Sequence, residues 1–246
     1  MKPSFIVVHV PHASTVIPES ERSSFRIDLA DELLKMTDHY CDELFCGEYP
    51  SVVFPVSRLV CDPERFRDDA QESMSSVGMG AVYTCTHDGA ILRAVDAATR
   101  ERILQTWYDP HHAALTAAVQ SALAHNGRCL IIDGHSFYPD PLPYEPDRNP
   151  DRPDFCIGTD PYHTPEKLTQ TAIRFLRSRG YSAAVNAPFA GTLVPLRFYQ
   201  KDKRVGSIMI EINRRLYMNA DGSRRARFSS VQEDVRLLLF ALLHDG

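Results

Sequence analysis

Several features that would place the chain at a membrane or on nucleic acid are missing from the sequence. No stretch approaches the roughly 18 to 20 apolar residues of a membrane-spanning helix, and the amino terminus lacks the apolar region and cleavage site of a secretory signal. The net charge is −5, with 27 Lys and Arg against 32 Asp and Glu, and the basic residues are dispersed. We therefore expect a cytoplasmic protein with a small-molecule partner, no nucleic acid and no membrane, whose oligomeric state stays open.

Familiar local metal and redox motifs are missing as well. The six cysteines contain no C-x-x-C pair, which excludes a zinc ribbon and a thioredoxin-like redox motif. No H-E-x-x-H pair is present, which excludes the familiar helical zinc motif. We expect the cysteines to be free and mostly buried thiols in a reducing compartment. A metal site in this chain must therefore be assembled by the fold from distant segments.

Strands and helices alternate in the sequence pattern. With 246 residues, 43% of them hydrophobic, the chain can bury a large core. Short, continuously apolar, β-branched runs predict strands buried on both faces, and segments with helical spacing separate them. The expected strands are 5–10, 51–56, 129–134, 155–157, 181–186 and 207–213, and the expected helices are 29–45, 96–125 with a break at 109–110, 165–179 and 228–244. The alternation predicts one α/β domain over 1–246, a three-layer sandwich with a mostly parallel mixed sheet and helices on both faces.

Two long irregular segments are expected to run over the surface. The polar run 62–80 contains several charged residues and two glycines, and 139–153 contains six prolines. Both compositions disfavour regular structure, and ordered loops of this length are often functional. Whether 139–153 closes over a site stays open.

Two histidines follow predicted buried strands. His12 comes after the run 5–10, and His135 comes after the run 129–134. In sheets of this kind, ligand sites open at the carboxyl ends of the strands, so the two imidazoles are expected to meet at one rim. A single histidine is more often a satisfied core residue, and it is the combination that indicates a metal site.

A third candidate lies inside a predicted central strand. Alternation along 207–213 places Ile208, Ile210 and Ile212 on one face and Glu211 on the other. A buried glutamate needs a cation nearby or holds its proton more tightly. Glu211 is therefore either an ion-pair partner of Arg214 or Arg215, or a general base beside a metal-activated water, and we favour the base.

Catalytic zinc sites typically use three protein ligands, often two histidines and a carboxylate. Asp38, on the helix expected over 29–45, is the candidate carboxylate, with Glu19 and His39 as alternatives that spacing does not separate. Asp133 is a candidate for orienting His135 from behind.

Arginines and a turn complete the expected site. Arg58 closes the second strand and Arg65 opens the polar loop, and a guanidinium binds a carboxylate in a bidentate way. Arg58, Arg65 and Arg214 are expected to orient an anionic substrate. Arginines of this group are also expected to stabilise the oxyanion of the tetrahedral intermediate. Asn186 and Gly191, after another strand, would let the backbone approach a ligand, although an ordinary turn explains them equally well.

Five ordered segments together resemble the N-formylglutamate amidohydrolase family. They are 11–14 (PHAS), 38–44 (DHYCDEL), 57–65 (SRLVCDPER), 133–136 (DGHS) and 211–217 (EINRRLY). The resemblance extends over nearly the whole chain. It implies a fold similar to the zinc carboxypeptidases, of the phosphorylase/hydrolase-like kind, and a metal-dependent amidase that releases formate and glutamate in histidine catabolism.

The resemblance also implies roles for individual residues. His12, Asp38 and His135 would hold one zinc ion, Glu211 would be the base, and Arg58 and Arg65 would hold substrate carboxylates. The chain departs from the family at His12-Ala13-Ser14, where His-Ser-Gly is frequent, and at 62–65, where Asp-x-Asn-Arg is frequent. The departures fall on the substrate side, so the acyl group and the amino acid stay open. Alternatives to this amidase are a related deacylase or carboxypeptidase-like amidase, a catalytically silent metal or anion binder, and a metal-free α/β protein.

Overall fold

The computed structural model describes residues 4–245 and is built on one six-stranded sheet, in the order β2-β1-β3-β6-β4-β5. The neighbours β2, β1, β3 and β6 run parallel to one another, whereas β4 is antiparallel to β6 and parallel to β5. The strands are β1 (Ile6–Val10), β2 (Ser51–Val53), β3 (Cys129–Phe137), β4 (Phe155–Gly158), β5 (Ala183–Val185) and β6 (Val205–Asn213). The expected mixed, mostly parallel α/β sheet is confirmed.

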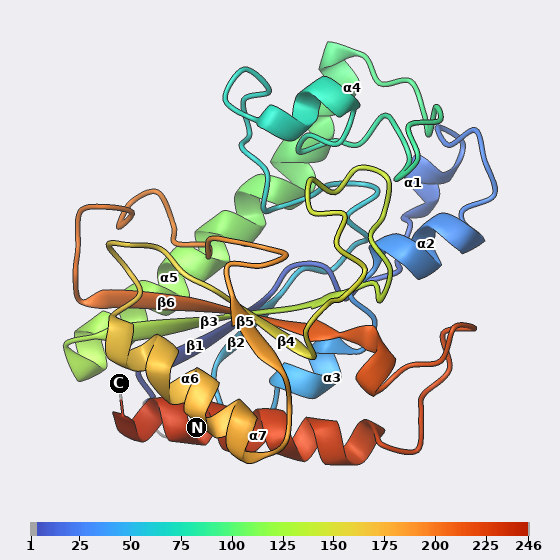
Figure 1. Cartoon of the computed structure of the whole chain (residues 1–246). Helices are drawn as coiled ribbons and strands as arrows, with labels where there is room; N and C mark the ends of the chain where they lie inside the picture. The colour runs from blue at the N-terminus through green and yellow to red at the C-terminus, as the bar shows by residue number, and fades with distance from the viewer. Residues whose placement is uncertain (1–3, 246) are drawn as a thin grey trace.

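Helices cover both faces of the sheet (Figure 1). On one face lie α3 (Cys41–Phe45), α6 (Glu166–Ser178) and α7 (Phe228–Asp245), and on the other lies α5 (Asp109–Asn126). Ile208, Ile210 and Ile212 pack in the core cluster beneath α6 and α7, whereas Val7 and Ile131 pack against α5. The side chains of Asp133, His135 and Glu211 therefore belong to the α5 face, because side chains alternate along each strand.

A third group of elements extends beyond the strand ends. It comprises the helices α1 (Glu19–Arg22), α2 (Ala30–Met36) and α4 (Ala97–Ile103), the 3₁₀ helix η1 (Ser73–Val77) and the π-helical turn η2 (Leu104–Tyr108). Residues around η2 share a separate core cluster that includes Phe54, Leu59, Tyr83 and Leu104. This part of the molecule stands over the carboxyl ends of β1, β3 and β6 (Figure 1).

The helix expected over 29–45 is interrupted. α2 ends at Met36 and α3 begins at Cys41, because Tyr40 has a positive φ of 66° and Thr37 is extended. The backbone N–H of Asp38 donates to the carbonyl of His12. Asp38 therefore lies in the break between two short helices and not on a helix as expected.

Other boundaries also differ from the sequence prediction. The chain does not break at Pro110, because η2 continues into α5 and Pro110 occupies the first turn, where its missing N–H is tolerated. β3 extends to Phe137, so His135 lies inside the strand and not past its end. Gly127 forms the expected left-handed cap, with φ 71°, and all six cysteines are free, four of them buried. None of the helices in the described part of the chain is long and apolar enough to span a bilayer.

Candidate active site

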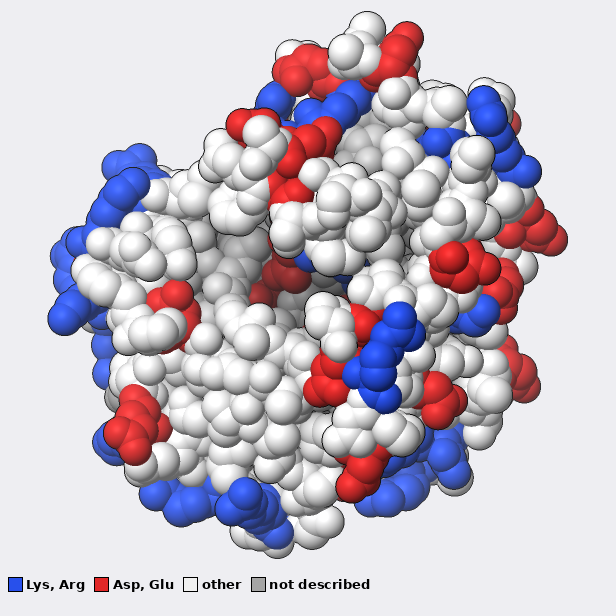
Figure 2. Space-filling model, turned by 45° about the horizontal axis from the view of Figure 1, so that its top comes forward, with Lys and Arg blue, Asp and Glu red and all other residues white. Residues whose placement is uncertain are grey.

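A cavity of about 330 Å³ opens at the carboxyl ends of β1, β3 and β6. Figure 2 shows a hollow on this side of the molecule, with acidic side chains at its floor. The lining includes the expected metal ligands, base and arginines: His12, Asp38, His135, Glu211, Arg58, Arg65 and Arg214. The proline-rich segment forms another part of the wall with Leu142, Tyr144, Glu145 and Pro146. Segments distant in the sequence therefore meet at one rim, as the strand pattern predicted.

His12 is fixed from behind by a buried carboxylate. Its Nε2 lies 2.8 Å from Asp62 Oδ1, and only 2% of the residue is exposed. Asp62 also accepts hydrogen bonds from Arg58 Nη2, at 2.8 Å, and from the Tyr83 hydroxyl, at 2.7 Å. The Nδ1 atom of His12 is buried and has no hydrogen-bond partner among the described residues. A ring held by one nitrogen, with the other left free, is the arrangement of a metal-ligating histidine.

Asp38 lies between the two histidines. Its Oδ2 is 3.1 Å from His135 Nδ1 and 3.7 Å from His12 Nδ1, and the two rings are 5.1 Å apart. Its Oδ1 accepts a hydrogen bond from Arg214 Nη2 at 3.1 Å. Burial alone would raise the pKa of Asp38, but the two neighbouring imidazoles, His12 and His135, hold it well below its usual value. Asp38 is therefore an ionised carboxylate beside both imidazoles.

Glu211 faces the same cavity from β6, paired in register with His135 on β3. Its Oε2 is buried without a hydrogen-bond partner within residues 4–245, and burial raises the pKa of Glu211 to about 8. Arg214 binds Asp38, and Arg215 binds Asp154. Neither arginine therefore forms the ion pair with Glu211 that the sequence left open.

Sequence reasoning missed Glu64, which the structure places in the middle of the site. Glu64 follows Asp62 in the polar segment, and its Oε2 is 3.2 Å from His135 Nε2 and 4.0 Å from His12 Nδ1. His12, Glu64 and His135 can each offer one ligand atom, with all three atoms within 4.8 Å of one another. The only sequence signal for Glu64 was its position in the 57–65 segment, beside Arg65.

The two alternative ligands lie elsewhere. Glu19 has a side chain that is 93% exposed and pairs with Arg22 on α1, while His39 Nε2 lies 3.2 Å from the backbone carbonyl of Leu33. Neither contacts His12 or His135 in the interactions of the described chain. Asp38 and Glu64 are therefore the carboxylates within reach of both histidines.

The expected substrate-binding residues divide into two groups. Arg58, Arg65 and Arg214 line the cavity, although all three side-chain nitrogens of Arg214 already donate to protein groups, Asp38 and Ser136 among them. Asn186 follows the edge strand β5 and bonds Thr159. The structure thus corrects the expectation for Asn186, which lines neither cavity because its side chain is bonded to Thr159, just after β4.

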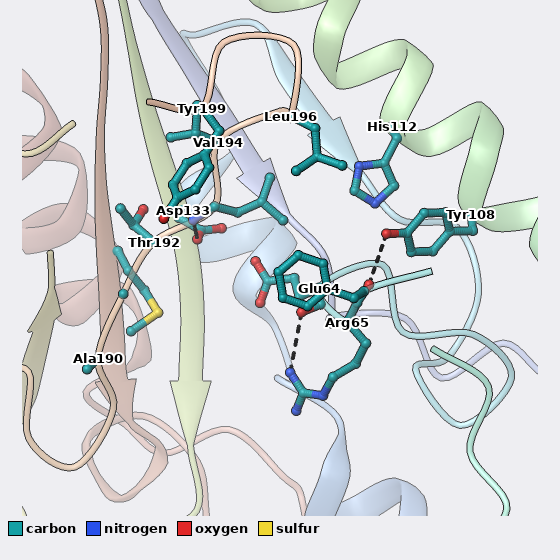
Figure 3. A pocket seen from close by; sticks show the side chains of 14 residues that line it. Glu64, Arg65, Tyr108, His112, Asp133, Ala190, Thr192, Val194, Leu196 and Tyr199 are labelled. Carbon is teal, nitrogen blue, oxygen red and sulfur yellow. Dashed lines mark hydrogen bonds between the residues drawn. The ribbon is translucent and has the colours of Figure 1, made fainter. Parts of the chain in front are cut away.

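Gly191 lines a second cavity of about 350 Å³ that adjoins the first (Figure 3). The two cavities share Glu64, Arg65, Ala190 and Met209. Figure 3 shows Asp133, from β3, and Glu64 approaching each other at this second cavity. The contacts of Asp133 include His135 Nε2, at 3.2 Å, and its orienting role stays a prediction.

Comparison with known proteins adds a family and a fold. A family model described as N-formylglutamate amidohydrolase matches residues 4–218. The fold is similar to the crystal structure of N-formylglutamate amidohydrolase from Ralstonia eutropha JMP134, with a TM-score of 0.82 and 24% identity over 99% of this chain and 94% of that one. A gene product of Agrobacterium tumefaciens has a TM-score of 0.69 and 19% identity over 97% and 90% of the two chains. No curated protein sequence matches the chain.

Proposed function

The chain belongs to the N-formylglutamate amidohydrolase family, and from this premise we propose that it is a metal-dependent hydrolase of N-acyl amino acids such as N-formyl-L-glutamate. Hydrolysis would release the carboxylic acid of the acyl group, which is formate for N-formyl-L-glutamate, and the free amino acid. The observation that carries the proposal is the buried, unpartnered Nδ1 of His12 beside His135 and Asp38, with the unpartnered Oε2 of Glu211 facing the same cavity. As part of the same proposal, residues 1–246 form one domain. The protein would act in the cytoplasm, and its substrate would be a small anionic molecule.

The donor set fits a divalent ion, and we propose zinc. His12, His135 and Asp38 would hold it, since two imidazoles and a carboxylate are a common ligand set of catalytic zinc. Buried polar atoms are normally satisfied, so the orphaned His12 Nδ1 fits a bound cation at this point. When bound, such an ion lowers the pKa of water toward about 7 and polarises an amide carbonyl.

The side chains around this set supply the remaining chemistry. Glu211 accepts the proton of the attacking water and passes it to the leaving nitrogen, because its free oxygen faces the cavity. Arg214 positions Asp38 through a buried hydrogen bond, and Asp62 positions His12. These contacts hold Asp38 and His12 in position before the substrate binds. Such preorganisation of an active site supplies much of an enzyme's rate acceleration.

Positive side chains on the cavity wall provide substrate recognition. Arg58 and Arg65 are proposed to bind substrate carboxylates, and both side chains line the cavity beside Glu64. The backbone at Gly191, where φ is 93°, is proposed to approach the substrate from the second cavity. Glu64 places a negative charge near the same space, so the amino acid that fits best must be measured and is not assumed to be glutamate.

Metal content and a substrate panel test the proposal together. We expect the purified full-length chain to contain a divalent metal by elemental analysis and to hydrolyse at least one member of a panel of formyl, acetyl and succinyl amino acids. Chelation should abolish turnover, and added zinc should restore it. Bound metal without turnover on any member would indicate a catalytically silent binder, and a metal-free protein would overturn the proposal entirely.

A further inference from the structure

We propose that the chain holds a second divalent cation between His9, Asp133 and Glu64, and that the Glu64 carboxylate bridges this ion to the one held by His12 and His135. The inference takes the first ion, held by His12 and His135, from the proposed function. The second ion is argued independently of it. We refer to His12, Asp38 and His135 as the first site and to His9, Glu64 and Asp133 as the second site. In the second site, as in the group His12, Glu64 and His135, each residue offers one ligand atom, with all three atoms within 4.8 Å of one another.

Strand register brings two members of the second site together. His9 on β1 is paired directly with Asp133 on β3, and the two side chains lie on the same face of the sheet. His9 Nδ1 is 2.8 Å from Asp133 Oδ1, and the residues are 0% and 1% exposed. The fold therefore fixes an imidazole nitrogen and a carboxylate oxygen next to each other in the interior.

Glu64 divides its two oxygens between the two sites. Oε2 faces the first site, at 3.2 Å from His135 Nε2 and 4.0 Å from His12 Nδ1. Oε1 faces the second site, at 3.8 Å from His9 Nδ1. A carboxylate in this position matches two-metal hydrolytic centres, in which the ions lie about 3.5–4 Å apart.

Groups behind the second site hold its ligand atoms in place. Asp133 Oδ2 accepts a hydrogen bond from the backbone N–H of Leu193 at 2.8 Å, which leaves Oδ1 facing His9. His9 Nε2 lies 2.9 Å from His111 Nε2 on α5. With a metal on Nδ1, His9 would carry its proton on Nε2 and donate it to His111. This is the support that ligating histidines normally receive, as His12 does from Asp62.

Charge balance also favours a cation here. Asp38 is paired with Arg214, and Asp62 with Arg58. Within residues 4–245, the ion-pair contacts of Glu64 and Asp133 are with histidines alone. Asp133 is 1% exposed, and carboxylates are almost never fully buried unless they are paired. A divalent ion between Asp133 and Glu64 would neutralise both.

The second site is also reachable. Glu64 and Asp133 both line the second cavity (Figure 3), whose wall continues through Thr192 and Leu193. A cation at this point would face that cavity with an open coordination position. It would attract a carboxylate of an N-acyl amino acid to a part of the site that has an apolar wall and is separate from Arg58.

Zinc stoichiometry tests the inference on the full-length chain. We expect metal-free protein titrated with Zn²⁺ to retain two ions per chain by elemental analysis, and Asp133→Asn to retain one. Asp154→Asn, which changes a carboxylate paired with the peripheral Arg215, is the matched control and should retain two. A single ion in the unaltered chain, or two ions in Asp133→Asn, would overturn the second site.

A spectroscopic measurement covers the case in which Asp133→Asn does not fold. The unaltered chain loaded with Mn²⁺ should give the electron paramagnetic resonance spectrum of two exchange-coupled ions, because a carboxylate bridge couples them. Two uncoupled ions would contradict the bridge. One bound ion with turnover would refute this inference and leave the proposed function intact. Two ions without turnover on the substrate panel would support this inference and contradict the proposed function.

Discussion

Glu211 is a carboxylate that a central strand places in a buried, charged cavity. The side chain is 8% exposed, and one of its oxygens has no partner in the described chain. Burial raises its pKa to about 8, so the group holds a proton more readily than an ordinary glutamate does. A residue with that property is suited to exchanging a proton with water and a leaving nitrogen.

Replacement of this carboxylate by its amide tests the role directly. We expect Glu211→Gln to lower kcat/KM for the best substrate by about 10²- to 10⁴-fold, the usual contribution of a general base, while metal content stays unchanged. Glu233→Gln, on the exposed side of α7, is the control and should retain full activity. Unchanged hydrolysis in Glu211→Gln with metal bound would show that another group is the base.

The residues of the site differ in how far the sequence could predict them. His12, His135 and Glu211 were predictable because buried strands have a period of two and parallel strands end at one edge. Asp62 and Glu64 were not, because they lie in an irregular segment whose path depends on tertiary packing. Asn186 was placed wrongly because a turn after a strand gives no information about which strand of the sheet it follows.

At the scale of elements, the break between α2 and α3 is the feature that local pattern could not predict. Apolar spacing continues through residues 36–45, so periodicity favours one helix. The backbone hydrogen bond from Asp38 to His12 and the left-handed conformation of Tyr40 end α2 instead. Tertiary contacts thus override local propensity at the point where the carboxylate must reach the two histidines.

The end of β4 provides a second test at this scale. A Cβ added at Gly158 would lie 2.2 Å from the carbonyl oxygen of Gly191 and 2.4 Å from Met209 Cε. We expect Gly158→Ala to lower the free energy of unfolding by about 1–3 kcal/mol, the usual cost of overpacking, because a backbone atom cannot move aside as a side chain can. Denaturant unfolding measures this change.

Gly47→Ala is the matched control for that variant. A Cβ at Gly47 would have nothing within 4 Å, so its effect should stay within about 0.5 kcal/mol, as for most surface changes. Equal stability of both variants would mean that β4 and the 190–194 wall are less tightly packed than the structure indicates.

At the scale of the whole molecule, an ion pair ties the elements beyond the strand ends to one another. Glu21 on α1 is 1% exposed and pairs with Arg102 on α4, at 2.7 Å. The hydrogen bond from Arg102 lowers the pKa of Glu21. A carboxylate whose pKa is lower in the folded state stabilises the fold above its unfolded pKa, and that stabilisation is lost as the pH falls through the folded value.

Acid unfolding of two variants checks this contact. We expect Glu21→Gln to be about 1.5–3 kcal/mol less stable than the unaltered chain at pH 7, the range for a hydrogen bond to a charged group. The difference should shrink as the pH falls below about 4, near the value for an unperturbed glutamate. Glu19→Gln, which changes the exposed neighbour on the same helix, should show no such pH-dependent difference. A constant difference at all pH values would exclude an electrostatic role for Glu21.

The reversed direction of β4 has a consequence for how substrate range can change. Because β4 is antiparallel to β6, it starts at the edge where β3 ends. The segment 138–154 therefore leaves from and returns to the same rim, and Leu142, Tyr144 and Pro146 form part of the cavity wall on the way. Insertions or deletions in this segment would enlarge or shrink the chamber while every strand kept its partners. Homologues that prefer acyl groups of different size should differ in the length of this one connection.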